Sequence, residues 1–120
     1  MPQHSPLYVL QFFLALVLAI FTELPTYYLF LKGNGSFQKI FSSTVVINII
    51  TVPIVWFILP VVGNYSFYVL CSESLAVLLE LALIRAIFSV SFWRAFVSSV
   101  IANVTSLSLG TWMLQFIILR

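Results

Sequence analysis

Charged residues are scarce in this sequence. Only 7% of its 120 residues are Asp, Glu, Lys or Arg, and the acidic ones are Glu23, Glu73 and Glu80. Soluble domains carry about 25% charged residues, so this composition excludes a soluble domain. The formal net charge of +2 comes from too few groups to indicate nucleic-acid binding.

Recognisable catalytic motifs are also missing. Cys71 is the single cysteine, which excludes a disulfide or a thiolate metal site within one chain. His4 has no partner at ligand spacing, and Gly33 and Gly35 belong to a short turn rather than to a phosphate-binding loop. No nucleophile and base follow the pattern of a serine, cysteine or zinc hydrolase. We therefore expect no catalytic residues, and the sequence indicates no particular cofactor or metal.

Apolar residues make up 62% of the chain and form four long runs. A bilayer core about 30 Å thick needs about 20 apolar residues per helical span, so the chain has room for four spans. The runs are continuously apolar, which excludes the period-two alternation of a transmembrane β-barrel. We predict helices at 7–31, 38–60, 65–88 and 95–119.

The predicted fold class is an all-α membrane protein with a single domain over residues 1–120. Because the connections are short, consecutive helices should be antiparallel neighbours in an up-down four-helix bundle. No Lys or Arg precedes the first apolar run, and no small-residue cleavage site follows it. We therefore interpret this run as a retained span rather than a signal peptide.

The second half of the chain resembles the first half. Residues 36–51 and 91–106 match at an offset of 55, including the polar pairs Ser36/Ser91, Ser43/Ser98 and Asn48/Asn103. Glu23-Leu24 matches Glu80-Leu81 at an offset of 57. This pattern predicts two tandem helical-hairpin repeats, at about 7–62 and 65–119, related by a pseudo-twofold axis along the membrane normal.

The few cations predict the orientation. Lys32, Lys39 and Arg94 all lie at or near the first and third connections, so by the positive-inside rule these connections are cytoplasmic and both termini are outside. Pro25 and Pro53 have no counterpart in the second repeat, which predicts an asymmetric cavity or gate beside the first two helices. Aromatic residues near the span ends are expected in the interfacial belts: Tyr27, Tyr28, Tyr65, Tyr68 and Trp93.

Two glutamates and two asparagines are predicted to lie at one depth. Glu23 precedes Lys32 by nine residues and Asn48 follows Lys39 by nine, while Glu80 and Asn103 have the same separation from the other connection. At 1.5 Å per residue, each lies about 13 Å from the cytoplasmic boundary. Small and polar residues at helical spacing should turn these side chains into the bundle: Ala15, Ala19, Thr44, Thr51, Ala76, Ser99, Ser106 and Gly110.

Ionisable groups at membrane depth are costly unless they are paired, protonated or hydrated, and they often mark function. Our hypothesis is that Glu23 and Glu80 bind a proton or a small cation, with Asn48, Asn103, Thr51 and Ser106 completing an oxygen-rich site. The alternative is that these groups only join the helices by hydrogen bonds worth about 1 kcal/mol or less each.

Glu73 precedes Glu80 by seven residues, on nearly the same helix face but about 10 Å further out. It is either a second station of a proton relay or a group in an outer aqueous vestibule that hydrogen-bonds Thr111 or Trp112. Both interpretations are open at the level of the sequence.

Spaced motifs along the chain are similar to those of a known group of proteins. They are Thr22-Glu23-x-Pro25, Asn48-x-x-Thr51-x-Pro53-x-x-Trp56, the pair Glu73/Glu80, and Asn103-x-x-Ser106-x-x-x-Gly110. The series resembles a family of small, uncharacterised four-span integral membrane proteins of prokaryotes. The resemblance implies the bundle and a prokaryotic cytoplasmic membrane, and it implies no particular activity.

Three classes of function follow. The first is a transport-related protein that handles a cation or a proton, and a bundle this small would then need a homo-oligomer to form a pathway. The second is an accessory or assembly subunit of a larger membrane complex, in which the polar layer is structural or binds a partner. A membrane-embedded enzyme is third, because no nucleophile and base are evident. In each class the lipid bilayer is a partner.

Overall fold

The computed structural model describes residues 5–58 and 64–117 of the chain. Its elements are α1 (Pro6–Leu31), α2 (Phe37–Pro53), the π-helical turn η1 (Ile54–Ile58), α3 (Tyr65–Ile87) and α4 (Phe92–Ile117). All four helices, with η1 continuing α2, are long and apolar enough to cross a membrane. The longest dimension of the molecule is 42 Å, close to the roughly 40–45 Å of a bilayer with its headgroups. The prediction of an all-α integral membrane protein with four spans is confirmed.

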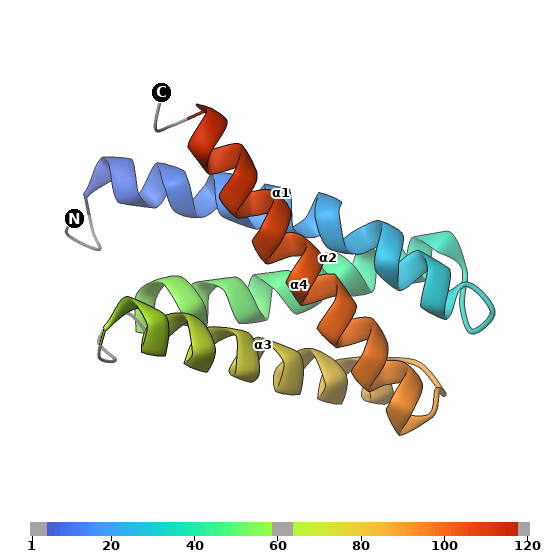
Figure 1. The fold of residues 1–120 in the computed structure, drawn as a ribbon. Helices are drawn as coiled ribbons and strands as arrows, with labels where there is room; N and C mark the ends of the chain where they lie inside the picture. The colour runs from blue at the N-terminus through green and yellow to red at the C-terminus, as the bar shows by residue number, and fades with distance from the viewer. Residues whose placement is uncertain (1–4, 59–63, 118–120) are drawn as a thin grey trace.

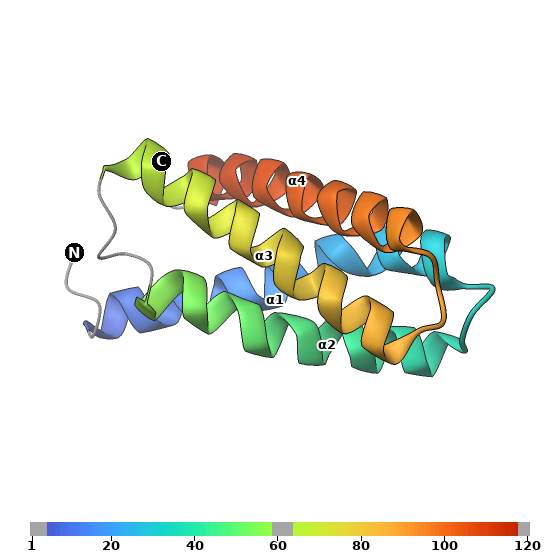
Figure 2. The same ribbon diagram turned by 90° about the horizontal axis from the view of Figure 1, so that it is seen from below.

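The helices form a closed ring in chain order. α1 packs against α2 and α4, and α3 packs against α4 and α2. Consecutive helices run in opposite directions, and the two connections at 32–36 and 88–91 lie at the same end (Figure 1). In Figure 1, α4 crosses in front of α1, and Figure 2 shows α3 beside α2, with α1 behind them. The helices therefore enclose a common interior.

Capping serines define where α1, α2 and α4 start, and Asn64 caps α3. The Ser5, Ser36 and Ser91 hydroxyls accept the N–H of Tyr8, Lys39 and Arg94, respectively, at 3.1, 3.2 and 3.2 Å. Such caps satisfy backbone donors that have no partner inside the helix. α4 accordingly begins at Phe92, before the predicted residue 95. The predicted helix ends at 60 and 119, and His4, lie outside the described residues.

The two connections at 32–36 and 88–91 are joined to each other. Asn34 Nδ2 donates to the Ser89 carbonyl at 3.2 Å, and Arg94 Nη1 donates to Asn34 Oδ1 at 3.0 Å. The Lys39 ammonium lies 4.9 Å from the centre of the Phe88 ring. Gly35 packs beside that ring, where an added side-chain carbon would come within 3.0 Å of it. We call this set of contacts the closed end of the bundle.

At its other end, α2 departs from α-helical geometry. The α-helix ends at Pro53 and continues as the π-helical turn η1, which the sequence analysis did not anticipate. A carbonyl at position 56 in an α-helix, or at position 55 in a π-helix, accepts the N–H of residue 60. Residue 60 is a proline and has no N–H. Instead, the Tyr8 hydroxyl donates to the Trp56 carbonyl, and the Tyr68 hydroxyl donates to the Val55 carbonyl at 2.7 Å.

Apolar side chains cover the outside of the bundle, and polar ones gather inside. Large apolar residues on every helix are exposed, among them Phe21, Ile49, Leu70 and Val104. The buried set contains many polar groups: Glu23, Ser43, Thr44, Asn48, Thr51, Ser72, Glu80, Ser98, Ser99 and Asn103. This distribution reverses that of a soluble protein and fits direct contact with lipid.

Candidate functional site

The four residues predicted to share one depth meet in the interior. Glu23 and Glu80 are 3% and 1% exposed, and Asn48 and Asn103 are also buried. Each comes from a different helix, so the layer draws on all four. None of these side chains faces lipid.

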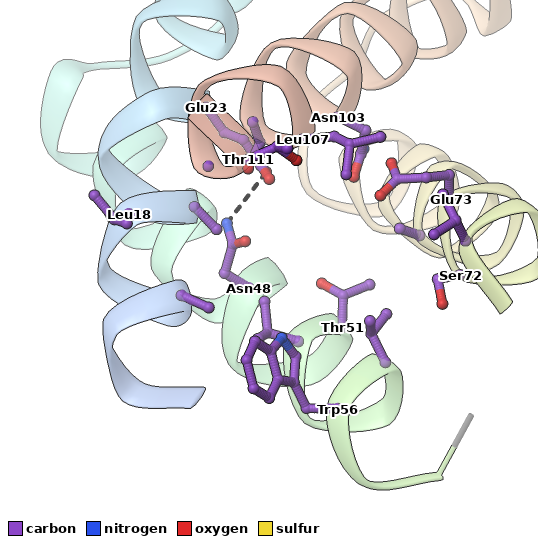
Figure 3. Close-up of a pocket in the computed structure, with 18 of the residues that line it drawn as sticks. Leu18, Glu23, Asn48, Thr51, Trp56, Ser72, Glu73, Asn103, Leu107 and Thr111 are labelled. Atoms are coloured by element: carbon purple, nitrogen blue, oxygen red, sulfur yellow. Dashed lines mark hydrogen bonds between the residues drawn. The ribbon is translucent and has the colours of Figure 1, made fainter. Parts of the chain in front are cut away.

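Glu23 on α1 is held by its neighbours on three helices. Asn48 Nδ2 donates to Glu23 Oε1 at 3.3 Å, the contact drawn as a dashed line in Figure 3. The Glu23 carboxyl also interacts electrostatically with Ser106 on α4 and with the Glu80 carboxyl on α3. Two neighbouring buried carboxyl groups repel each other when both are charged, so a proton on one of them stabilises the pair.

Glu80 has a different set of donors. The Tyr27 hydroxyl donates to Glu80 Oε1, and the Asn103 amide and the Glu23 carboxyl interact with Glu80 electrostatically. The prediction that Tyr27 lies in an interfacial belt is wrong, because Tyr27 is 1% exposed. Tyr27 follows Glu23 by four residues and so continues the interior face of α1.

The two asparagines use the same geometry. Asn48 Nδ2 donates to the Thr44 carbonyl at 2.9 Å, and Asn103 Nδ2 donates to the Ser99 carbonyl at 2.8 Å. An amide nitrogen has two hydrogens, so Asn48 is fixed to its own helix and still donates to Glu23. Asn103 is fixed in the same way and interacts electrostatically with Glu80.

Thr51 and Ser106 differ in how their hydroxyl groups relate to the glutamates. The Thr51 hydroxyl donates to the Ile47 carbonyl of its own helix, which fixes its hydrogen away from the glutamates. Ser106 is half-buried and contacts Glu23. Both residues line the cavity described next, Thr51 from α2 and Ser106 from α4.

A cavity of about 410 Å³ extends from the carboxyl pair toward the end of the bundle opposite the closed end (Figure 3). Glu23, Glu80, Asn48 and Asn103 lie at its inner part. Its outer part includes residues near the starts of α1 and α3 and the ends of η1 and α4: Tyr8, Gln11, Trp56, Tyr68 and Thr111. We call this space the central cavity.

Glu73 lies on the α3 wall of the central cavity, between the carboxyl pair and the outer part. It is half-buried, and it also borders a shallow groove between α3 and α4 with Val77 and Phe96. Of the two interpretations of Glu73, this position fits a group in an outer vestibule, and a relay through it stays a prediction.

Ser72, beside Glu73, is the one buried side-chain oxygen in the described residues that has no hydrogen-bond partner. It is 3% exposed and lines the central cavity. Ser72, Ala76 and Glu80 recur at intervals of four, so extending the α3 stripe outward by one turn would have identified it. The same extension of the α1 stripe reaches Tyr8 and Gln11.

Metal binding by side chains has little support in this part of the chain. Within residues 5–58 and 64–117, no three His, Cys, Asp or Glu side chains converge as metal ligands. Hard divalent cations usually take several carboxylate or carbonyl oxygens, and this layer offers two carboxyls that already contact each other. The arrangement suits a proton better than a divalent ion.

Fold and site together define an integral membrane protein with four helices and a buried, hydrogen-bonded carboxyl pair at the inner part of a cavity. No family model, curated protein or solved structure matches the chain. The resemblance to small four-span prokaryotic proteins therefore stays a prediction, and the function is argued from the chemistry of the site.

Proposed function

We propose that this protein handles protons within the membrane, as part of a transport process, at the Glu23–Glu80 pair. The observation that carries the proposal is the burial of both carboxyl groups at the inner part of one cavity, inside four lipid-facing helices. Two adjacent carboxylates in a medium of low dielectric constant repel each other strongly, so the pair holds one proton and can accept or release a second.

The donors around the pair suggest where the shared proton resides. Glu80 receives the hydroxyl hydrogen of Tyr27, whereas Glu23 receives an amide hydrogen of Asn48 and no tyrosine in the described part of the chain donates to it. Donors stabilise the charged form of a carboxyl group. In our proposal Glu80 is the carboxylate and Glu23 carries the proton that it donates to Glu80.

The proposal includes the tandem repeat. Asn48 and Asn103 make equivalent bonds to their own helices, and each interacts with the glutamate of the preceding helix. Ser36 and Ser91 also cap α2 and α4 in the same way. Two hairpins related by a pseudo-twofold axis account for these matched contacts, and Tyr27 breaks the symmetry because Ile84 stands in its place at an offset of 57.

The proposed setting is a prokaryotic cytoplasmic membrane, with the closed end cytoplasmic and the central cavity open toward the outside. Lys32, Lys39 and Arg94 at the closed end support this orientation by the positive-inside rule. The pair would then be hydrated from the outer side and separated from the cytoplasm by the closed end. Assembly into a homo-oligomer is part of the proposal, since one small bundle leaves little room for a complete pathway.

The test is proton flux into lipid vesicles that contain the purified full-length protein and an internal pH-sensitive dye, driven by a potassium diffusion potential. We expect Glu23→Gln and Glu80→Gln to abolish the flux, because an amide cannot release a proton and approximates the shape of the acid. Arg85→Gln is the matched control, since Arg85 is an exposed charge on α3 and should leave the flux unchanged.

Wild-type protein that gives no flux, and that co-purifies with a larger membrane complex, would contradict the proposal. That result would instead identify an accessory subunit whose polar layer joins helices.

A further inference from the structure

The central cavity has the dimensions of a small-molecule site. Its volume of about 410 Å³ lies within the range of about 300–1,000 Å³ that is usual for ligand pockets. All four helices and η1 contribute to its walls, and it ends at the carboxyl pair. A ligand there would touch the groups to which we assign proton handling.

The charge of the cavity determines which sign of charge the ligand should carry. Glu23, Glu73 and Glu80 line it, and no Lys, Arg or His from the described residues does. With one proton shared by the pair, a negative charge remains at the inner part. A cation is therefore the complementary ligand, since an anion or a neutral molecule would leave this charge without compensation.

The walls select a ligand with an apolar body. Apolar side chains from α1, α2, η1 and α3 form much of the surface: Ala15, Leu18, Val52, Val55 and Val69. At the outer part, the Tyr8 and Trp56 ring centres are 5.0 Å apart with the planes inclined by 52°, and Tyr68 on α3 also lines the cavity. Aromatic faces attract organic cations. An inorganic cation would use neither the volume nor these rings.

The Ser72 oxygen favours a ligand that can donate a hydrogen bond to it. Its oxygen is buried beside the cavity with no partner in the described residues, although buried polar atoms are almost always paired. A protonated amine can donate a hydrogen to this oxygen and direct its charge toward the carboxyl groups. A quaternary ammonium ion has no such hydrogen.

We propose that the central cavity binds a monovalent organic amine in its protonated form, with an apolar or aromatic body of small-molecule size. The inference rests on the proposed function in that both use the Glu23–Glu80 pair. The amine and a second proton compete for the one negative charge of the pair, so acidification weakens amine binding.

Several titratable groups face the pair and the cavity. α2 and α4 contribute the neutral amides of Asn48 and Asn103, and the titratable groups come from α1 and α3: Tyr8, Glu23, Tyr27, Tyr68, Glu73 and Glu80. Tyrosines keep their protons in the acidic range, where only the three glutamates change charge. A weakening of amine binding by acid therefore reports on these glutamates.

The experiment measures binding of 2-phenylethylamine to the full-length protein in lipid nanodiscs through tryptophan fluorescence. Trp93→Phe and Trp112→Phe leave Trp56, which lines the cavity, as the only reporter. We expect a saturable change with 2-phenylethylamine and binding about tenfold weaker or more with 2-phenylethanol, its neutral counterpart of similar shape. Benzyltrimethylammonium, which lacks an N–H, should bind more weakly than the amine.

Substitutions measure how much Glu80 and Ser72 contribute to amine binding. Glu80→Gln should weaken amine binding by about tenfold or more, and Ser72→Ala by several-fold, because each removes a partner of the ammonium group. The control for Ser72→Ala is Ser66→Ala, at an exposed position on the same helix. Ser72→Ala should leave benzyltrimethylammonium binding unchanged, which separates a lost hydrogen bond from a misfolded cavity.

The outcomes distinguish this inference from the proposed function. Equal binding of the amine and 2-phenylethanol would overturn it and identify an apolar pocket. Absence of amine binding would also overturn it, even where Glu23→Gln and Glu80→Gln abolish proton flux and so uphold the proposed function. Amine binding by a protein that gives no proton flux would support the amine-binding inference and contradict proton transport.

Discussion

Tyr27 shows how one side chain can make two similar carboxyl groups different. Its hydroxyl donates to Glu80, and the corresponding position in the second half of the chain is Ile84, which has no hydroxyl to offer Glu23. Both positions are fully buried. The Tyr27 hydroxyl therefore gives Glu80 a donor that Glu23 lacks, and within the proposed repeat the unequal roles that we propose for the two glutamates follow from this one position.

Tyr27→Phe should destabilise the protein by about 1 kcal/mol. Interhelical hydrogen bonds in membrane proteins average about 0.6 kcal/mol, and leaving a buried acceptor unpaired costs about 1–3 kcal/mol. Reversible unfolding in mixed micelles measures the free energy of unfolding.

The matched control is Tyr28→Phe, since Tyr28 is exposed and packs its ring on Phe37. Equal losses for both variants would show that the Tyr27 hydroxyl contributes nothing specific.

The sequence predicted the glutamates and asparagines of the site better than the tyrosines that hydrogen-bond there. Counting from Lys32 and Arg94 placed Glu23 and Asn103 at similar depths, because helical rise is constant. The aromatic partners were missed, since tyrosines near span ends are usually interfacial and hydropathy says nothing about where a hydroxyl points. The contact between the carboxyls depends on helix crossing, which no local pattern encodes.

At the scale of the element, η1 is where α2 departs from regular geometry. Pro53 removes one backbone donor and the proline at position 60 removes another. Tyr8 on α1 and Tyr68 on α3 then donate to carbonyls of η1, which ties three helices together at the outer part of the cavity. The proline was visible in the sequence, but the π-helical turn was not, because it depends on these distant donors.

Pro53→Ala should shift the fluorescence of Trp56 and leave the total helix content unchanged. The alanine would have an N–H to donate to the Ile49 carbonyl, so α-helical geometry would extend into η1 and rotate Trp56 relative to the cavity. Emission spectra in the Trp93→Phe, Trp112→Phe background, together with circular dichroism, measure both quantities.

Pro25→Ala is the control, since Pro25 lies inside α1, close to the connection at 32–36. An emission spectrum that Pro53→Ala does not alter would show that η1 forms independently of the proline.

For the whole molecule, composition and run length were enough to predict four membrane helices. Apolar residues exceed what a soluble interior could bury, and short connections leave only antiparallel neighbours. The sequence indicated a cavity only through the unequal proline content of its two halves. The volume of the cavity could not be predicted, because it depends on how four helices cross.

The orientation can be tested with cysteines. In a Cys71→Ser background, Gly33→Cys should resist a membrane-impermeant maleimide added to intact spheroplasts, and Ser66→Cys should react. Gly33 has free space around it, and Ser66 is exposed near the start of α3. Labelling after lysis is the control for accessibility. The reverse pattern would place the closed end outside.

The closed end also constrains how the molecule can move. Asn34 bridges the connections at 32–36 and 88–91 through Ser89 and Arg94, and at the opposite end Tyr68 on α3 donates to the Val55 carbonyl of η1. The two helix pairs are therefore joined by hydrogen bonds on both sides of the carboxyl layer. Any motion that widens the outer part of the central cavity would have to break the contact between Tyr68 and Val55.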